Sequence, residues 1–284
     1  MKNISLLYFI SLTFIMIIGS SFSGSAASES SNKYPFIKNT QPLSAWISEL
    51  DEELRGNGIS GNLVKDSFDG FTPIERVIEL DRKQPEGTMT LDEYLKKVIS
   101  KKRIEDGRAE FSRNKKSLNK VAKKYGIPPE VIVALWGIET NYGSNIGNFN
   151  TIHALATLAY DGRRSEFFRK ELINAFKIME AEKMNSDGFI GSWAGAFGQC
   201  QFMPSSYLRY AVDFDGDGRR DIWDTPEDIF ASIANYLAKE GWDSKYSGVG
   251  KEGSHNFNVV LRWNRSRYFA TAVSNLSKAI KASN

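Results

Sequence analysis

The chain is poor in the residues that build disulfides and histidine-based sites. Among its 284 residues it has one cysteine, Cys200, so no disulfide can form within it. Its only two histidines, His153 and His255, lie far apart and lack the spacing of a zinc site or a catalytic triad. With no histidine near it in the sequence, Cys200 is interpreted as a small wall residue and not as a nucleophile. The fold must therefore be stabilised by packing, to which a metal ion could add.

Strong charge and strand patterns are also missing. The formal net charge is only +3, and no dense block of lysine and arginine occurs, so nucleic acid is not expected as a partner. Alternating strand patterns are scarce, whereas apolar residues recur at three- and four-residue spacing in five segments. These are residues 46–54, 91–99, 111–125, 172–179 and 226–237. With 41% hydrophobic residues the chain can bury a sizeable core, and we predict a predominantly helical α+β fold.

The amino terminus has the pattern of a secretory signal. Lys2 precedes a mostly apolar stretch, residues 4–19, which gives way to small and polar residues. We predict a signal peptide over residues 1–27 with cleavage after Ala27, an uncleaved anchor being the alternative. Residues 28–45 are then a linker or arm, and residues 46–280 a single folded unit.

One glutamate, Glu139, follows an unbroken apolar run, residues 131–138. If this run forms a helix, nearly all faces of the helix are apolar and would be buried. Pro128 and Pro129 mark the start of that helix, and Thr140 to Gly143 require a turn after it. Burial and the negative end of the helix dipole would both raise the pKa of the carboxyl toward neutrality, as a general acid requires. The alternative is a glutamate that caps the turn, pairs with an arginine or points to solvent.

A glycine-rich segment, residues 188–202, mixes glycines with aromatic and amide side chains. Glycine lets the backbone approach a ligand closely, aromatic faces stack on sugar rings, and amides bind sugar hydroxyls. The segment therefore suits a carbohydrate. The alternative is a surface turn in which Trp193 and Phe197 anchor the core.

An acidic segment begins like the calcium loop of an EF-hand. Its carboxylates occupy positions 1, 3 and 5, and a glycine occupies position 6. The end departs from the pattern, because Asp224 stands where glutamate is usual and Glu227 follows three residues later. The predicted ligand set for a structural calcium ion is Asp213, Asp215, Asp217, Arg219 and Glu227. Without metal, the same residues could form a turn held by carboxylate hydrogen bonds and by Arg219 and Arg220.

A series of motifs runs along the chain. The motifs are ELDRKQPE (79–86), Arg103 with Gly107-Arg108, YGIPP (125–129), WGIETNYG (136–143), ALATLAYD (154–161), GSWAGA (191–196), QFMPSS (201–206) and IWD (222–224). In this order, over about residues 45–275, they resemble the membrane-bound lytic transglycosylase B family, glycoside hydrolase family 103. The resemblance implies a lysozyme-like core at about residues 110–245 with additional helical lobes, and peptidoglycan glycan strands as the substrate.

The same resemblance implies the chemistry. Glu139 would first protonate the glycosidic oxygen between N-acetylmuramic acid and N-acetylglucosamine. It would then remove the proton from the muramoyl C6 hydroxyl, giving a 1,6-anhydro product without any cofactor. Two alternatives stay open: a muramidase in which a second carboxylate helps water to attack, and a non-catalytic peptidoglycan-binding protein.

The resemblance also assigns glycan contacts to five residues: Tyr160, Ser192, Gln201, Trp263 and Asn264. The family usually has tyrosine and asparagine, a small serine-containing spacer and another tyrosine. Here the run is Trp263-Asn264-Arg265-Ser266-Arg267-Tyr268-Phe269, so Phe269 stands in the second aromatic place. Since the predicted cleavage point has no lipid-attachment cysteine, we expect an exported, periplasmic protein. Partners in cell-wall synthesis or division and a monomeric state are further expectations.

Overall fold

The computed structural model describes residues 37–83 and 89–282. The described part of the chain contains thirteen helices and two short strands, which confirms the predominantly helical α+β prediction. The helices are α1 (Leu43–Gly56), α2 (Gly61–Phe68), α3 (Glu75–Arg82), α4 (Leu91–Val98), α5 (Lys101–Arg113), α6 (Lys115–Tyr125), α7 (Pro129–Thr140), α8 (Thr151–Asp161), α9 (Ser165–Glu182), α10 (Pro204–Tyr210), α11 (Pro226–Lys239), α12 (His255–Trp263) and α13 (Arg267–Lys281). The strands β1 (Phe149–Asn150) and β2 (Ile190–Gly191) pair antiparallel.

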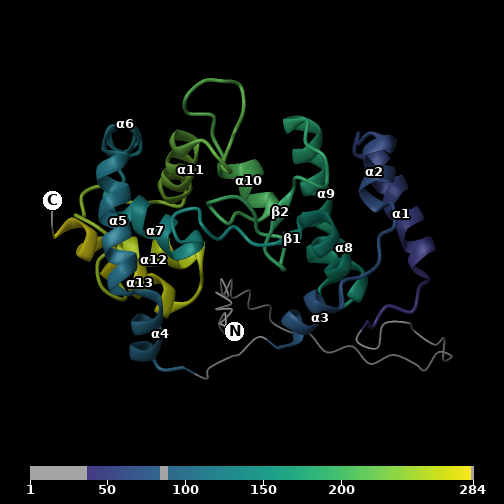
Figure 1. Ribbon diagram of the computed structural model, residues 1–284, viewed down its shortest axis with the longest axis horizontal. Helices are drawn as coiled ribbons and strands as arrows, with labels where there is room; N and C mark the ends of the chain where they lie inside the picture. The colour runs from purple at the N-terminus through teal and green to yellow at the C-terminus, as the bar shows by residue number, and fades with distance from the viewer. Residues whose placement is uncertain (1–36, 84–88, 283–284) are drawn as a thin grey trace, which may run out of the picture.

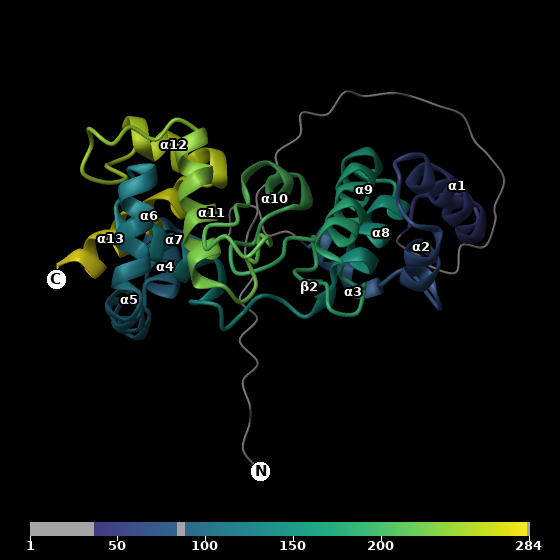
Figure 2. The same ribbon diagram turned by 90° about the horizontal axis from the view of Figure 1, so that it is seen from above.

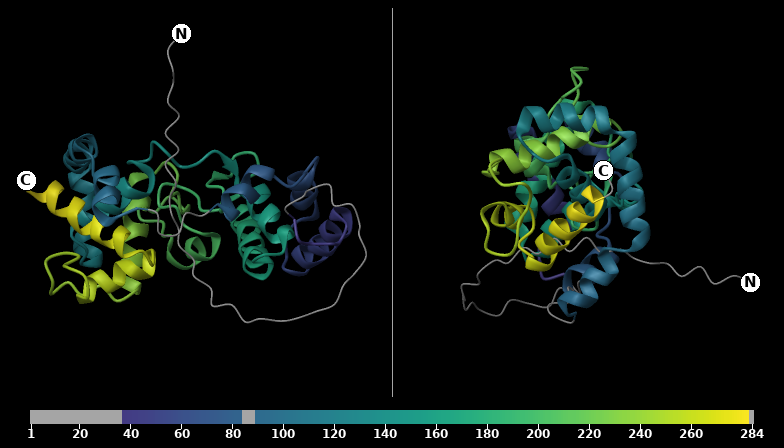
Figure 3. Two further views of the ribbon diagram at one scale, coloured as in Figure 1. Left: turned by 90° about the horizontal axis from the view of Figure 1, so that it is seen from below. Right: turned by 90° about the vertical axis from the view of Figure 1, so that its left-hand side faces the viewer.

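The helices form two groups with the small strand pair and α10 between them (Figure 1). One group contains α4 to α7 with α11 to α13, and the other contains α1 to α3 with α8 and α9 (Figure 2). The last helix, α13, returns to pack on α7, α5 and α4, so the end of the described chain lies in the first group (Figure 3). The predicted signal peptide and the first half of the predicted arm, residues 28–36, lie outside the described residues. In the part that is described, no helix has the length and apolar character needed to cross a membrane.

Helix α7 is the centre of the first group. It contacts α5, α6, α11 and α13, and its residues 131–137 are all buried. The helix begins with Pro129 at its first position, and its last turn carries Glu139, as the sequence predicts. Three consecutive residues with positive φ follow: Asn141 (51°), Tyr142 (58°) and Gly143 (82°). This left-handed turn reverses the chain directly after the glutamate.

The ring of Tyr142 packs between α5 and α7, and two glycines make room for it. The Tyr142 hydroxyl donates a hydrogen bond to the carbonyl oxygen of Arg103 at 2.7 Å. A Cβ atom added at Gly137 would lie 2.5 Å from the ring, and one added at Gly107 would lie 2.4 Å from the hydroxyl oxygen. The two glycines thus allow the turn after α7 to lie tightly against both helices.

A buried ion-pair cluster explains two of the sequence motifs as structural. Asp81, 2% exposed, accepts hydrogen bonds from Arg163 at 2.6 and 2.7 Å and also pairs with Arg82 and Arg164. Arg82 also binds Asp161, at 2.7 Å. The arginines lower the pKa of Asp81 even though burial opposes them. The cluster joins α3 to the end of α8 and the start of α9.

Candidate active site

Glu139 opens onto a groove of about 380 Å³. Its walls come from α7, α9, α11, the segment before and at the start of α10, and the end of α12. The lining residues are Glu139, Phe167, Glu171, Gln201, Phe202, Met203, Ser205, Ser206, Tyr236, Arg262, Trp263, Asn264 and Arg265. Three of the five predicted glycan contacts, Gln201, Trp263 and Asn264, therefore share a groove with the predicted acid.

Trp263 contacts the Glu139 carboxylate directly. Its indole Nε1 donates a hydrogen bond to Oε1 of Glu139 at 2.7 Å. The indole ring packs against Tyr236 and Phe202, with ring centroids 4.6 and 5.3 Å away. Because an indole N–H only donates, it can orient the carboxylate without competing for the proton that a general acid transfers. The alternative of an isolated glutamate pointing to bulk solvent does not fit this position.

Gln199 fixes the turn at the end of α7. Its side-chain oxygen accepts a hydrogen bond from Trp136 Nε1 at 2.8 Å, and its amide nitrogen donates to the carbonyl oxygen of Trp223 at 2.5 Å. Thr140 Oγ1 donates to the backbone oxygen of Gln199 and accepts from the N–H of Gly143, at 3.2 and 3.0 Å. Gln199 therefore links α7 to the glycine-rich segment, to Trp136 through its side chain and to the turn after Glu139 through its backbone oxygen. The sequence showed an amide in that segment but not this role.

Gln201 presents an acceptor to the groove. Its backbone has a positive φ of 48°, and its side-chain nitrogen donates to the carbonyl oxygens of Ile146 and Gly198, both at 3.1 Å. These bonds use both N–H groups of the amide. The side-chain oxygen is then the group suited to a sugar hydroxyl or to the N–H of an acetamido group.

The remaining predicted contacts lie elsewhere or serve the backbone. Asn264, 6% exposed, accepts a hydrogen bond from the N–H of Ser266 at 2.9 Å, which shapes the turn after α12. Ser192 accepts from the N–H of Ala196 at 3.0 Å and is not among the groove-lining residues, so its glycan contact stays a prediction. Phe197 is buried in the core, as the alternative for the glycine-rich segment predicts.

The structure differs from the prediction at Tyr160. Tyr160 is 4% exposed, its ring packs edge-on against Trp46, and its hydroxyl donates to the carbonyl oxygen of Gln41 at 2.7 Å. It has almost no surface to offer a glycan, so we remove it from the proposed contacts. Phe269 is likewise buried, at 5% exposure, while its neighbour Tyr268 is on the surface.

The sequence analysis missed Tyr236 and Glu171 as groove residues. Tyr236 is 9% exposed, and its hydroxyl donates to the carbonyl oxygen of Arg262 at 2.7 Å. Glu171, 4% exposed, accepts from the N–H and the hydroxyl of Ser205 at 2.9 and 2.6 Å, and so holds the start of α10. Burial raises the pKa of Glu171, although the bonds from Ser205 oppose the shift.

The raised pKa of Glu171 predicts a pH-dependent stability. Since the folded state binds the proton more tightly than the unfolded state, the free energy of unfolding should rise as pH falls through the folded-state pKa. The gain should level off below the unfolded-state pKa of about 4.3. Urea unfolding of wild type and Glu171→Gln should be compared between about pH 4 and 8, a range chosen around the reference pKa of glutamate. Only the wild type should gain this free energy of unfolding as the pH falls. Identical pH profiles would contradict the prediction.

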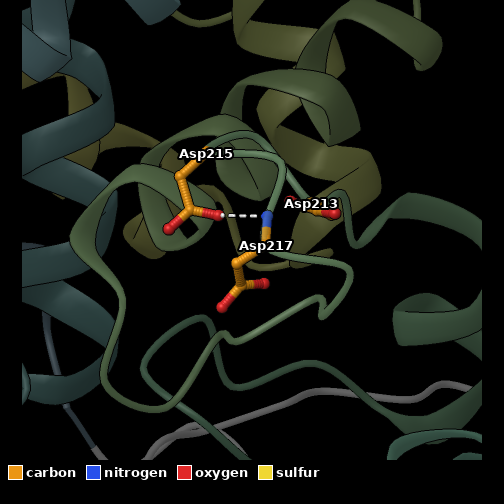
Figure 4. Close-up of side chains that lie close together, drawn as sticks. All are labelled: Asp213, Asp215 and Asp217. Atoms are coloured by element: carbon orange, nitrogen blue, oxygen red, sulfur yellow. Dashed lines mark hydrogen bonds between the residues drawn. The ribbon is translucent and has the colours of Figure 1, made fainter.

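The acidic segment forms a compact cluster before α11 (Figure 4). Single carboxylate oxygens of Asp213, Asp215 and Asp217 lie within 4.8 Å of one another. The N–H groups of Gly216 and Gly218 donate to Asp213 at 2.7 and 2.8 Å, and that of Asp217 donates to Asp215 at 3.1 Å. Desolvation raises the pKa of Asp213, but these hydrogen bonds outweigh it and hold the pKa below its ordinary value.

The cluster combines three carboxylate oxygen donors in one small loop, which is the ligand chemistry that calcium prefers. Arg219 is exposed, and its N–H donates to Asp217 at 2.8 Å.

The structure also differs from the prediction at Glu227, which is not part of this cluster. Its carboxylate accepts a hydrogen bond from Ser117 of α6. Asp228, which is fully buried, closes the loop instead by accepting from the N–H groups of Phe214 and Asp221 at 2.7 and 2.8 Å. Adjacent helical residues point about 100° apart, so only one of this pair can face the loop.

Comparisons with known proteins show which family the chain is similar to. A family model described as a transglycosylase SLT domain matches residues 42–252. The membrane-bound lytic murein transglycosylase B of Escherichia coli K12 is 41% identical over 150 residues, which cover 52% of this chain and 41% of that protein. The chain thus matches about two fifths of the length of that relative.

Two solved structures are similar over most of the chain. SltB3 of Pseudomonas aeruginosa, in complex with NAG-anhNAM-pentapeptide, has a TM-score of 0.79 and 33% identity, covering 85% of this chain and 80% of that one. The Escherichia coli lytic transglycosylase Slt35, in complex with calcium, has a TM-score of 0.74 and 28% identity, covering 88% and 95%.

Proposed function

The chain belongs to the transglycosylase SLT domain family, and on that premise we propose that it is a lytic transglycosylase acting on peptidoglycan. The bond cleaved is the β-1,4 bond between N-acetylmuramic acid and N-acetylglucosamine. The observation that carries the proposal is Glu139, held by Trp263 at 2.7 Å at the wall of the groove. The similarity to SltB3, which was solved with an anhydro-muramoyl ligand, supports it.

A single carboxyl group can perform both proton transfers of this reaction. Protonated Glu139 donates its proton to the glycosidic oxygen as the bond from muramoyl C1 to that oxygen breaks. The resulting carboxylate then accepts the proton of the C6 hydroxyl while O6 bonds to C1, closing the 1,6-anhydro ring. Glu139 ends in the protonation state in which it started. No water is consumed, and no step requires a cofactor.

Hydrolysis is the second candidate because another carboxylate lines the same groove. A two-carboxylate glycosidase needs its acids about 5 to 9.5 Å apart. Glu171 is the groove residue that could take the second role. Both of its oxygens, however, accept hydrogen bonds from Ser205, which commits this side chain to holding α10.

Mass spectrometry of released fragments separates the two candidates. Purified protein is incubated with peptidoglycan, and the muramoyl ends of the products are weighed. Anhydro ends, lighter by one water, support the lytic reaction. Reducing muramic acid ends would establish hydrolysis, and Glu171→Gln would then be the variant to compare. A peptidoglycan-binding protein without activity would release no fragments.

We further propose that the acidic loop holds a structural calcium ion through Asp213, Asp215 and Asp217. The calcium complex of the similar Slt35 supports this proposal. At calcium about 100-fold above the dissociation constant, binding should stabilise the fold by about 2.7 kcal/mol. Thermal unfolding should shift upward by roughly 5 to 10 °C on adding calcium, and this shift should disappear in Asp215→Asn.

The control for this prediction is magnesium, which needs a tighter octahedral site and should shift the transition less. An unchanged transition at millimolar calcium would leave the loop as a turn held by its own hydrogen bonds.

We also propose that the protein is exported to the periplasm and acts there as a monomer, with cell-wall synthesis or division complexes as candidate partners. The amino-terminal pattern over residues 1–27 supports export. Cell fractionation, with the amino terminus of the exported form determined by sequencing, tests this proposal.

A further inference from the structure

The wall of the groove formed by the end of α12 carries two arginines, Arg262 and Arg265. In a strand that retains its peptides the sugars are N-acetylated and uncharged, because the lactyl carboxyl of N-acetylmuramic acid forms an amide bond with the stem peptide. Binding the glycan backbone of such a strand does not require positive charge. The stem peptides attached to N-acetylmuramic acid, in contrast, carry free carboxylates. A pair of arginines in the same groove as the proposed acid is therefore more suited to the peptide than to the sugar.

The two arginines differ in how they are held. Arg262, whose side chain is 58% exposed, donates from Nη1 to the carbonyl oxygen of Glu240 at 2.5 Å and lies 3.6 Å from that residue's carboxylate. Glu240 thus holds the Arg262 guanidinium against the end of α11. Arg265 is also exposed and also lines the groove. Its guanidinium has five N–H donors in a planar fork, enough to bind a carboxylate in addition to a protein contact.

The backbone around Arg265 is fixed on both sides. Two residues before it, Trp263 binds Glu139 at 2.7 Å. Immediately before it, Asn264 accepts from the N–H of Ser266, and Ser266 in turn caps α13 by accepting from the N–H of Phe269 at 3.3 Å. Two residues of extended chain span at most roughly 7 Å, so the backbone of Arg265 lies within this distance of the residue that contacts the acid.

The position also departs from the family pattern, in which a small serine-containing spacer follows the asparagine. Here that spacer contains Arg265 and Arg267. Only one of these two side chains, that of Arg265, lines the groove. Arg267 is 73% exposed, pairs with Glu252 at 3.0 Å and is not a groove-lining residue. The chain therefore offers one spacer arginine in the groove and one outside it.

We propose that Arg265 is a specificity-determining residue that binds a carboxylate of the stem peptide on the N-acetylmuramic acid next to the cleaved bond. This inference rests on the proposed function, which places that sugar at Glu139. Its consequence is a preference for glycan strands that retain their peptides over strands from which an amidase has removed them.

Turnover of these two substrates tests the inference. Arg265→Ala should lower kcat/KM on peptide-bearing strands by roughly tenfold, mainly through KM, because a charge-assisted bidentate contact to the peptide is lost. Amidase treatment leaves a free lactyl carboxylate, so in the peptide-free substrate this group is converted to a neutral amide. Turnover of that substrate by Arg265→Ala should stay within about twofold of wild type. Arg265→Lys should fall between wild type and Arg265→Ala. Arg267→Ala is the matched control and should behave as wild type on both substrates.

Two results would overturn the inference: an equal loss on both substrates, which would mean that Arg265 acts through Glu139, or no loss on either. A binding measurement keeps the test independent of the proposed function. Titration of Glu139→Gln with a disaccharide pentapeptide and with the disaccharide whose lactyl carboxyl is a neutral amide should show tighter binding of the former. Arg265→Ala on that background should abolish the difference. If wild type releases no fragments, the proposed function fails, and this titration still decides the role of Arg265.

Discussion

Glu139→Gln is expected to lower kcat by at least about 10³-fold without unfolding the protein. General acid and base catalysis each contribute on the order of 10² to 10⁴, and one residue is proposed to supply both. Glutamine is isosteric, and its side-chain oxygen can still accept the hydrogen bond that Trp263 donates at 2.7 Å, but it has no acidic proton to give. Fragment release, circular dichroism and glycan affinity of the variant are the measurements, and affinity should stay within a few-fold of wild type.

The control is Glu166→Gln, which removes a carboxylate that is 85% exposed and pairs with Lys170 at 2.7 Å. It should retain full turnover. If Glu139→Gln kept more than roughly a tenth of the wild-type rate, a general acid role of this size would be wrong. Glu171, as the other carboxylate of the groove, would then be the next acid to test. Loss of folding would instead indicate that Glu139 is needed for stability.

The helix that carries Glu139 could be predicted because its signals are local. An unbroken apolar run, Pro129 at the start and Gly143 in the following turn fix the type and the bounds of α7 within a few residues. Burial on all faces follows from the run itself, and the structure confirms it for residues 131–137.

The opposite wall of the groove could not be derived from local patterns. Trp263 is 124 residues away from Glu139 in the sequence, and only the family resemblance joined the two. Tyr236 carries the same apolar helical spacing as its buried neighbours in α11, so nothing in its periodicity separates a groove wall from a core position. Arg262 and Arg265 are exposed arginines of an ordinary kind until the fold places them beside the acid.

The two differences from prediction have the same origin. Tyr160 lies on α8, and its hydroxyl points to the backbone of Gln41, a contact between segments 119 residues apart. Glu227 and Asp228 are adjacent, and the loop uses the second because α11 turns the first toward Ser117. Composition and spacing in the sequence limit which residues are candidates for a site. The packing of helices that are distant in the sequence decides which of these candidates faces the site.

Gly137→Ala is expected to destabilise the protein, against the usual effect of that substitution in a helix. Alanine normally favours a helix over glycine by about 1 kcal/mol. Here the added Cβ would lie 2.5 Å from the ring of Tyr142, which cannot retreat easily, because its hydroxyl is held by the carbonyl oxygen of Arg103 and faces Gly107. Overpacking of this kind costs about 1 to 3 kcal/mol, so urea unfolding should show a lower free energy of unfolding.

The same substitution should also affect turnover, because Tyr142 belongs to the turn that follows Glu139. A displacement near 1 Å at a catalytic group can cost about 100-fold in rate, so kcat should fall by roughly 10- to 100-fold in folded protein. Gly56→Ala is the control: a Cβ there meets nothing within 4 Å, and the variant should be neutral or slightly stabilising. On a Tyr142→Ala background the sign should reverse and Gly137→Ala should stabilise, since the obstructing ring is gone. Stabilisation by Gly137→Ala alone would show that the ring moves aside, and would disconnect this glycine from the geometry of the acid.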